Sequence, residues 1–155
     1  MFGKIKATVQ NKGTIDLGTA GSNLTGLIGM FGQSSNASEP VKIENLGGTI
    51  NVNTESSAGM YADNSSGTVS NVTLENTGTI NVNRKKSAGI YAPKSTVSKV
   101  GKVNLDNVAN GASAVYIEDG GVVTAAETAE INLGTANQNR VAYYVNGAGS
   151  ALAGA

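Results

Sequence analysis

The chain repeats itself at a nearly constant interval. The stretch GTINVNTESSAGMYADN at residues 48–64 returns at residues 78–94 as GTINVNRKKSAGIYAPK. Self-similarity at a fixed period of roughly 20–50 residues is typical of solenoids, propellers and other repeat arrays. The repeat therefore restricts the fold more than any single motif in the sequence.

The first element of the repeat alternates apolar and polar residues. Ile50 and Val52 flank Asn51, and the pattern recurs in every copy, ending with Ile131 and Leu133. Such alternation predicts a half-buried strand with its apolar side chains inward and its polar side chain outward. The copies are GTIDLG (13–18), GTINVN (48–53), GTINVN (78–83), KVNLDN (102–107) and EINLGT (130–135), with outward residues Asp16, Asn51, Asn81, Asn104 and Asn132.

The second element is a short run that contains glycine in its first three copies. The runs are LIGMFG (27–32), SAGMYA (57–62), SAGIYA (87–92), SAVYIE (113–118) and VAYYVN (141–146). Alternation predicts the inward pairs Ile28/Met30, Ala58/Met60, Ala88/Ile90, Val115/Ile117 and Tyr143/Val145. The opposite parity then carries a column of outward aromatic residues, namely Phe31, Tyr61, Tyr91, Tyr116 and Tyr144.

A third apolar element lies before each copy, at residues 5–9, 41–43, 69–74, 97–100 and 122–123. The intervals between copies are unequal, as the positions of their leading residues show: Ile15, Ile50, Ile80, Val103 and Ile131. A propeller blade needs four antiparallel strands and about 40 residues or more, whereas three short strands in roughly 30 residues fit one coil of a parallel β-helix. We therefore predict an all-β fold, with residues 1–155 forming one parallel β-helix segment of about five coils.

Stacking of coils explains which positions vary between copies. Inward positions lie on their counterparts one coil away and must stay apolar, while outward asparagines can form ladders of side-chain amides. Loop positions tolerate change, and we expect Glu55 and Lys85 on adjacent coils to attract each other weakly. The basic run at residues 84–86 is either a solvated loop or a docking patch.

Composition excludes several functions. Lys and Arg together number 11, as do Asp and Glu, so there is no basic excess for binding nucleic acid. The absence of Cys and His excludes thiolate or imidazole metal sites and triads that need histidine. No apolar run reaches the roughly 20 residues that cross a membrane, and no signal peptide is visible. We expect no enzyme activity, no cofactor, no metal and no membrane insertion in this segment, which we interpret as part of a longer chain.

Carboxylates are the remaining candidates for catalytic or calcium-binding groups. Glu118 and Asp119 precede two glycines, so the pair is interpreted as a turn, a calcium ligand set or a catalytic pair. The calcium-binding nonapeptide is absent, and Asp16 fits the outward ladder.

The aromatic column is the candidate ligand-binding site. Outward aromatic rings can bind sugars or a protein partner, or they can simply stack and stabilise the face. Both interpretations of Phe31, Tyr61, Tyr91, Tyr116 and Tyr144 remain open.

The motif N-x-G-T-I-N-V-N…S-A-G-I-Y-A resembles the passenger repeats of large autotransporters, the type V secreted proteins of Gram-negative bacteria, and most of all long fusobacterial-type adhesins. The resemblance covers about residues 10–147, with the best copies at 45–64 and 75–94. It implies a right-handed parallel β-helix, an extracellular location on an outer-membrane-anchored passenger, and a role in adhesion or virulence. The lack of cysteine suits export in an unfolded state.

The functional expectation is a stalk or display segment of a surface adhesin whose partner is a host or bacterial surface protein or glycan. Exposed coil ends would also allow end-to-end self-association. The alternatives are a carbohydrate- or protein-binding module that uses the tyrosines, and a polysaccharide-active enzyme on a β-helix.

Overall fold

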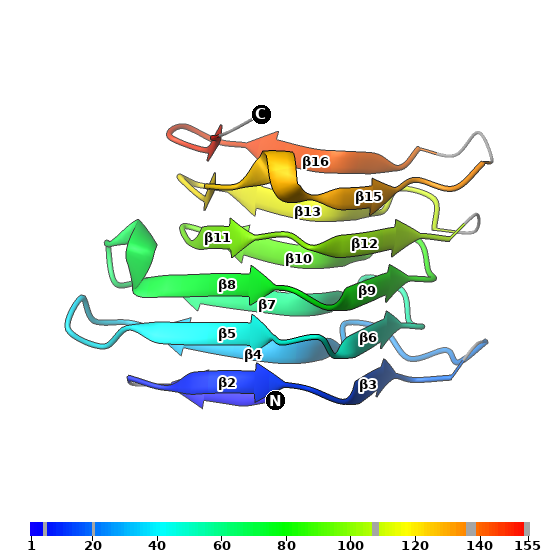
Figure 1. The fold of residues 1–155 in the computed structure, drawn as a ribbon, viewed down its shortest axis with the longest axis horizontal. Coiled ribbons are helices and arrows are strands. Elements are labelled where there is room, and N and C mark those ends of the chain that lie inside the picture. Colours follow the sequence, from blue (N-terminus) through cyan, green and yellow to red (C-terminus); the bar gives the residue numbers. More distant parts are fainter. Residues whose placement is uncertain (5, 20, 107–108, 136–138, 154–155) are drawn as a thin grey trace.

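The chain folds into three parallel sheets wound around one axis. The computed structural model describes residues 1–4, 6–19, 21–106, 109–135 and 139–153. Every strand pairing within these residues is parallel, and each strand pairs with its counterparts in neighbouring coils. Figure 1 shows the coils stacked from the blue N-terminal coil to the red C-terminal coil. The predicted fold class, a parallel β-helix of about five coils, is confirmed.

Each coil passes through the three sheets in turn. Sheet 1 contains β1 (Phe2–Lys4), β4 (Ile28–Ser34), β7 (Ala58–Asn64), β10 (Ala88–Pro93), β13 (Ser113–Glu118) and β16 (Val141–Asn146). Sheet 2 contains β2 (Thr8–Asn11), β5 (Val41–Asn45), β8 (Val72–Asn76), β11 (Thr96–Lys99), β14 (Val122–Val123) and β17 (Ala151–Leu152). Sheet 3 contains β3 (Thr14–Leu17), β6 (Thr49–Val52), β9 (Thr79–Val82), β12 (Lys102–Leu105) and β15 (Glu130–Asn132).

Two short 3₁₀ helices interrupt the strands, η1 (Val69–Asn71) and η2 (Ala126–Thr128). The predicted strand at 69–74 is therefore wrong in its first half, because the chain turns through η1 before β8 begins at Val72. Ile5, at the start of the predicted strand 5–9, lies outside the described residues.

The core consists of inward rows from all three sheets. In the middle coils the predicted inward residues of the first element are buried: Ile50, Val52, Ile80, Val82, Val103 and Leu105. The prediction is wrong for Leu133, which is exposed because β15 ends at Asn132 and the alternation ends with it. Val145 is also exposed, because β16 is the outermost strand of sheet 1 and no described strand covers it.

The glycine of the second element shifts the inward–outward alternation by one residue. Gly59 and Met60 are adjacent and both buried, and a Cβ on Gly59 would lie 3.0 Å from Ile80 Cγ2 in the core and 2.7 Å from the Gly89 carbonyl. Two consecutive inward positions bend the strand as a bulge does. Ile28 is consequently 39% exposed, so its predicted inward position is wrong. Ala58 is buried but lies outside the core cluster, and it lines a groove on the outer face of the sheet together with Ala88.

Side-chain amides form ladders along the axis, as predicted for sheet 3. There, Asn51 donates to Asp16 at 2.7 Å, and Asn81 donates to Asn51 at 2.8 Å. Asn104 continues the ladder by donating to Asn81 at 2.8 Å. Each amide satisfies the one beside it, so the ladder joins four coils.

A second ladder is buried at the corner between sheets 2 and 3. Asn11 donates to Asn45 at 2.8 Å, Asn45 donates to Asn76 at 2.7 Å, and Asn76 donates to the Val100 carbonyl at 2.6 Å. Asn45 also donates to the Gly48 carbonyl at 3.0 Å. The sequence predicted turns at these asparagines, but it did not predict that their side chains are buried. Asn45 and Asn76 are completely buried.

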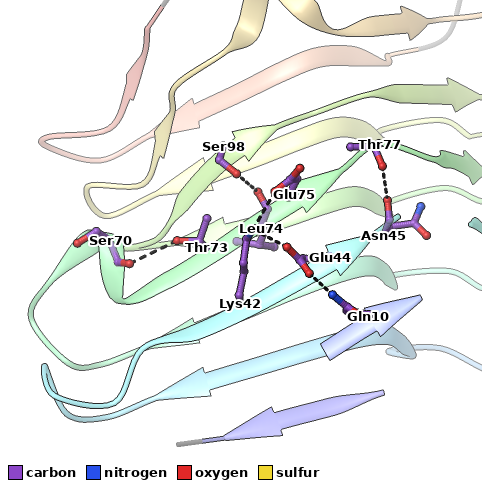
Figure 2. A network of polar contacts seen from close by, with 10 residues as sticks. All are labelled: Gln10, Lys42, Glu44, Asn45, Ser70, Thr73, Leu74, Glu75, Thr77 and Ser98. Atoms are coloured by element: carbon purple, nitrogen blue, oxygen red, sulfur yellow. Dashed lines mark hydrogen bonds and ion pairs between the residues drawn. The ribbon is translucent and has the colours of Figure 1, made fainter. Parts of the chain in front are cut away.

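Charged side chains on the outer face of sheet 2 also connect coils (Figure 2). Lys42 pairs with Glu44 on its own strand and with Glu75 at 3.0 Å on the next coil, while Gln10 donates to Glu44 at 2.6 Å. The bond to Lys42 is the main reason that the pKa of Glu44 is lowered, and the bond to Glu44 is the main reason that the pKa of Lys42 is raised.

Replacing Asn45 by Ala should destabilise the fold by about 3 kcal/mol, because it removes three hydrogen bonds from a buried corner, those with Asn11, Asn76 and the Gly48 carbonyl. The control Asn51→Ala removes a more exposed ladder member and should cost less than about 1 kcal/mol. Urea unfolding followed by far-ultraviolet circular dichroism measures both. Equal losses in the two variants would contradict a special role for the buried ladder.

Replacing Glu44 by Gln should lower stability by at most about 1 kcal/mol at neutral pH, because Lys42 is 43% exposed and solvent screens the pair. Because the pKa of Glu44 is lowered, the stability difference between wild type and Glu44→Gln is complete at pH values above 4.5, the ordinary pKa of a glutamate. The difference disappears as the pH falls through the lowered pKa of Glu44. The pKa of Lys42 is raised, so the contribution of Lys42 to folding stability is complete below pH 10.5, the ordinary pKa of a lysine. That contribution is lost as the pH rises through the raised pKa of Lys42. Urea unfolding at graded pH measures the difference, and its persistence at strongly acidic pH would count against this assignment.

Candidate functional site

Six of the seven aromatic residues form one column on the outer face of sheet 1. They occupy a single register row from β1 to β16: Phe2, Phe31, Tyr61, Tyr91, Tyr116 and Tyr144. The five residues predicted from the sequence are thus in one column, and Phe2 extends it by one coil. The seventh aromatic residue, Tyr143, is partly buried against the core.

The lower part of the column is a stack of nearly parallel rings. Phe31 and Tyr61 have centroids 5.3 Å apart at 26°, and Tyr61 and Tyr91 have centroids 4.9 Å apart at 8°. Stacked rings cover each other's faces and leave their edges free, and the edge of an aromatic ring carries partial positive charge. The inner rings of this stack therefore offer their edges to a ligand.

The stack changes direction between Tyr91 and Tyr116. Their centroids are 5.0 Å apart, but the ring planes lie at 89°. In this arrangement the edge of one ring meets the face of the other, so one ring keeps a face that its neighbour does not cover. Tyr116 and Tyr144 are again stacked, at 4.6 Å and 24°.

Glu118 holds the two tyrosine hydroxyls at this perpendicular step. The Tyr91 hydroxyl donates to Oε1 of Glu118, and the Tyr116 hydroxyl donates to Oε2 at 3.2 Å. Burial and the Glu118 carboxylate raise the pKa of Tyr91, so this phenol stays protonated at physiological pH. The same causes raise the pKa of Tyr116.

The neighbouring outward row explains why Glu118 is available to the tyrosines. That row runs Gln33, Asp63, Pro93, Glu118 and Asn146. Gln33 donates to Asp63 at 2.7 Å, but Pro93 has no side-chain donor to offer Glu118 from the coil before. The acidic side chains of this row also contribute to the raised pKa of Tyr61, after its burial.

A groove of about 470 Å³ runs beside the column, and we call it the tyrosine groove. One wall contains Tyr61, Tyr91 and Tyr116, the floor contains Ala58, Ala88 and Ser113, and the far rim contains Ser56, Lys86 and Gly111. Its volume lies within the range of small-ligand sites, roughly 300–1,000 Å³. The groove exists because each small floor residue precedes two consecutive inward residues, Gly59–Met60, Gly89–Ile90 or Ala114–Val115, and therefore faces outward.

The chain's sequence also matches a known family. Residues 2–87 match the family described as the BigA fourth domain, which is more than half of the 155 residues. The chain belongs to the BigA fourth domain family. Membership indicates a surface-exposed, adhesin-like structural domain of a bacterial protein. Comparisons with curated proteins and with solved structures found no significant match.

The BigA match covers the coils from β1 to β9. It includes Tyr61 and Lys86 but not the perpendicular step at Tyr91 and Tyr116. Family membership therefore describes the repeated framework, while the distinctive part of the groove lies beyond the matched residues. Within the described part of the chain, no helix is long and apolar enough to cross a membrane.

The basic residues at 84–86 have different surroundings in the structure. Lys85 pairs with Glu55 at 3.3 Å, which confirms the predicted attraction between adjacent coils, whereas Lys86 lines the tyrosine groove.

The two predicted turn acids also differ. The predicted turn is confirmed, because the Gly121 amide donates to the Glu118 carbonyl at 3.0 Å and Asp119 adopts a φ of 52° between them. Glu118 is also the last residue of β13, and its side chain contacts tyrosines. Among the described residues, no group of three or more acidic side chains is arranged to hold a metal.

Sequence reasoning missed Phe2 and the role of Glu118, although both had a signal. The interval from Phe2 to Phe31 is close to the interval from Phe31 to Tyr61, so Phe2 fits the period of the repeat. Glu118 follows Tyr116 by two positions, which places both side chains on the same outward face of a strand.

Replacing Glu118 by Gln should lower the pKa of Tyr91, because it removes the negative charge that disfavours the phenolate. The pKa should remain above its ordinary value of 10.0, because burial is the larger cause of the shift. A spectrophotometric pH titration of phenolate absorbance measures this, with Asp119→Asn as the matched control. An identical titration curve for wild type and Glu118→Gln would refute the link.

Proposed function

We propose that this segment is a rigid stalk or display segment in the passenger of a bacterial autotransporter adhesin. The observation that carries the proposal is the unbroken parallel pairing of every coil with the next. A solenoid of this kind resists bending because hydrogen bonds, asparagine ladders and stacked rings all run along its axis. The repeat's resemblance to autotransporter passengers and the membership in the BigA family support the same assignment.

We propose further that the segment is not an enzyme. Glycosidases need two carboxyl groups facing a bound sugar across a groove. Among the described residues that line the tyrosine groove, none is acidic. Asp63 and Glu118 lie in the row beyond the tyrosines, and each already accepts a hydrogen bond from a neighbouring side chain. These contacts favour a structural role for both carboxylates.

The whole protein, on this proposal, is anchored in the outer membrane and exposes the segment outside the cell. Its partner is a host or bacterial surface protein or glycan, and adhesion is the activity of the complete passenger. The absence of cysteine is compatible with secretion of an unfolded chain.

Deleting residues 14–48 from the natural full-length protein tests the stalk. The deletion removes one repeat and joins Gly13 to Thr49, which occupies the same register position as Thr14. A stalk shortened by one coil, about 4.8 Å, should still be exported and should support undiminished adhesion. Surface labelling with antibody to the folded segment, before and after external protease, measures export, and cell attachment measures adhesion.

Two outcomes would overturn the proposal. Antibody labelling that requires permeabilised cells would exclude a surface passenger. A deletion variant that is displayed normally but no longer mediates attachment would show that this coil does more than separate other parts of the passenger. A deletion of residues 16–51, which joins Ile15 to Val52 inside the strand, serves as the control because it shifts the inward–outward alternation by one and should prevent folding of that coil.

A further inference from the structure

The tyrosine groove is open to solvent, and Ile28 lines one end of it. Its floor is formed by small side chains in three successive coils, Ala58, Ala88 and Ser113, whereas the larger Ile28 occupies the equivalent position in the coil before. Coils are spaced about 4.8 Å apart, so three of them give a slot about 10–14 Å long. That length suits one or two sugar rings, or a short peptide.

The charges around the groove favour an anionic ligand. Among the described residues lining it, Lys86 is the only charged one, and its ammonium has no ion-pair or hydrogen-bond partner in that part of the chain. The adjacent Lys85 does not line the groove and is paired with Glu55. Glu118 lies beyond the tyrosine wall, where two hydroxyl groups already donate to its carboxylate.

The tyrosine wall favours a ring-shaped ligand with an apolar face. The edges of Tyr61 and Tyr91 carry partial positive charge, which complements ligand oxygens. The perpendicular step between Tyr91 and Tyr116, which both line the groove, leaves one ring face without a stacked neighbour. An uncovered aromatic face of this kind can stack against the C–H face of a sugar.

The backbone of the floor argues against an extended peptide. The amide of Ala58 donates to the Leu27 carbonyl at 2.9 Å, that of Ala88 to the Ser57 carbonyl at 2.9 Å, and that of Ser113 to the Ser87 carbonyl at 3.0 Å. Peptides that add to a sheet need an unpaired strand edge, and these strands are paired on both sides. Recognition in the groove therefore depends on side chains, as in sugar sites.

We propose that the tyrosine groove binds a carboxylate-bearing sugar of an acidic glycan. The sugar carboxylate pairs with Lys86, and the sugar ring lies on the small floor residues against the tyrosine wall. This inference deepens the proposed function, since a surface adhesin would meet such glycans, and it makes this segment a binding module as well as a spacer.

Binding of the purified chain to sialyllactose and to lactose tests the proposal directly, because the two differ only in the carboxylated sugar. Isothermal titration calorimetry should show sialyllactose binding at least about tenfold more tightly than lactose, a difference of about 1.4 kcal/mol. Lys86→Gln should weaken sialyllactose binding by about tenfold, and the matched control Lys85→Gln should leave it unchanged. Ala88→Leu should abolish binding by filling the floor.

Several results would overturn the inference. They are equal affinities for sialyllactose and lactose, the absence of binding to both sialyllactose and an oligogalacturonate, and equal effects of the two lysine variants. Tighter binding of a tetraglutamate peptide than of sialyllactose would show that the groove prefers an acidic peptide, and would overturn the assignment to a sugar. Circular dichroism checks that the Ala88→Leu variant is folded. If that variant is unfolded, the Lys86→Gln variant still tests the proposal. The binding assays use purified protein, so a negative binding result does not affect the stalk proposal. A negative result in surface labelling likewise does not affect the proposal that the groove binds a sugar.

Discussion

Axial register is the constraint on which the rest of this structure depends. Each residue lies on its counterpart one coil away, at the spacing of strands in a sheet, so a row of equivalent positions behaves as a single physical unit. An inward row must keep one character in every coil, because a single polar member would be buried between two apolar neighbours. An outward row can be polar, and its members can also satisfy one another, as Asn51 does when it donates to Asp16 and accepts from Asn81.

The same constraint explains why asparagine is used where the chain must turn in the interior. A carboxylate row would place like charges next to each other in a buried corner, at high electrostatic cost. An amide offers a donor to one neighbour and an acceptor to the other, so a row such as Asn11, Asn45 and Asn76 can be extended through every coil without leaving a group unpaired. Burial then strengthens each bond rather than penalising it.

The alternation of residues predicted much of this fold, but not its irregularities. The register of the sheets and the aromatic column follow from period and parity, which are properties of the sequence alone. The outward position of Ile28 does not, because it depends on Gly29 and Met30 both facing inward, and a glycine carries no side chain from which its direction could be inferred. The contact of Glu118 with Tyr91 also escaped prediction, because it joins the paired strands β13 and β10 of two different coils, and the alternation within one strand does not show which side chain of the next coil it meets.

A strictly periodic solenoid presents the same surface at every coil, so a distinctive site requires a departure from the period. Here the departure lies between Tyr91 and Tyr116, whose separation in sequence is shorter than the equal intervals between Phe31, Tyr61 and Tyr91. The shorter coil retains the register of sheet 1 and brings Glu118 beside Pro93, where it draws two hydroxyls together and turns one ring against the next. The groove runs along the stacked pair Tyr61 and Tyr91 as well as this step, so the site combines the periodic framework with its one departure from the period.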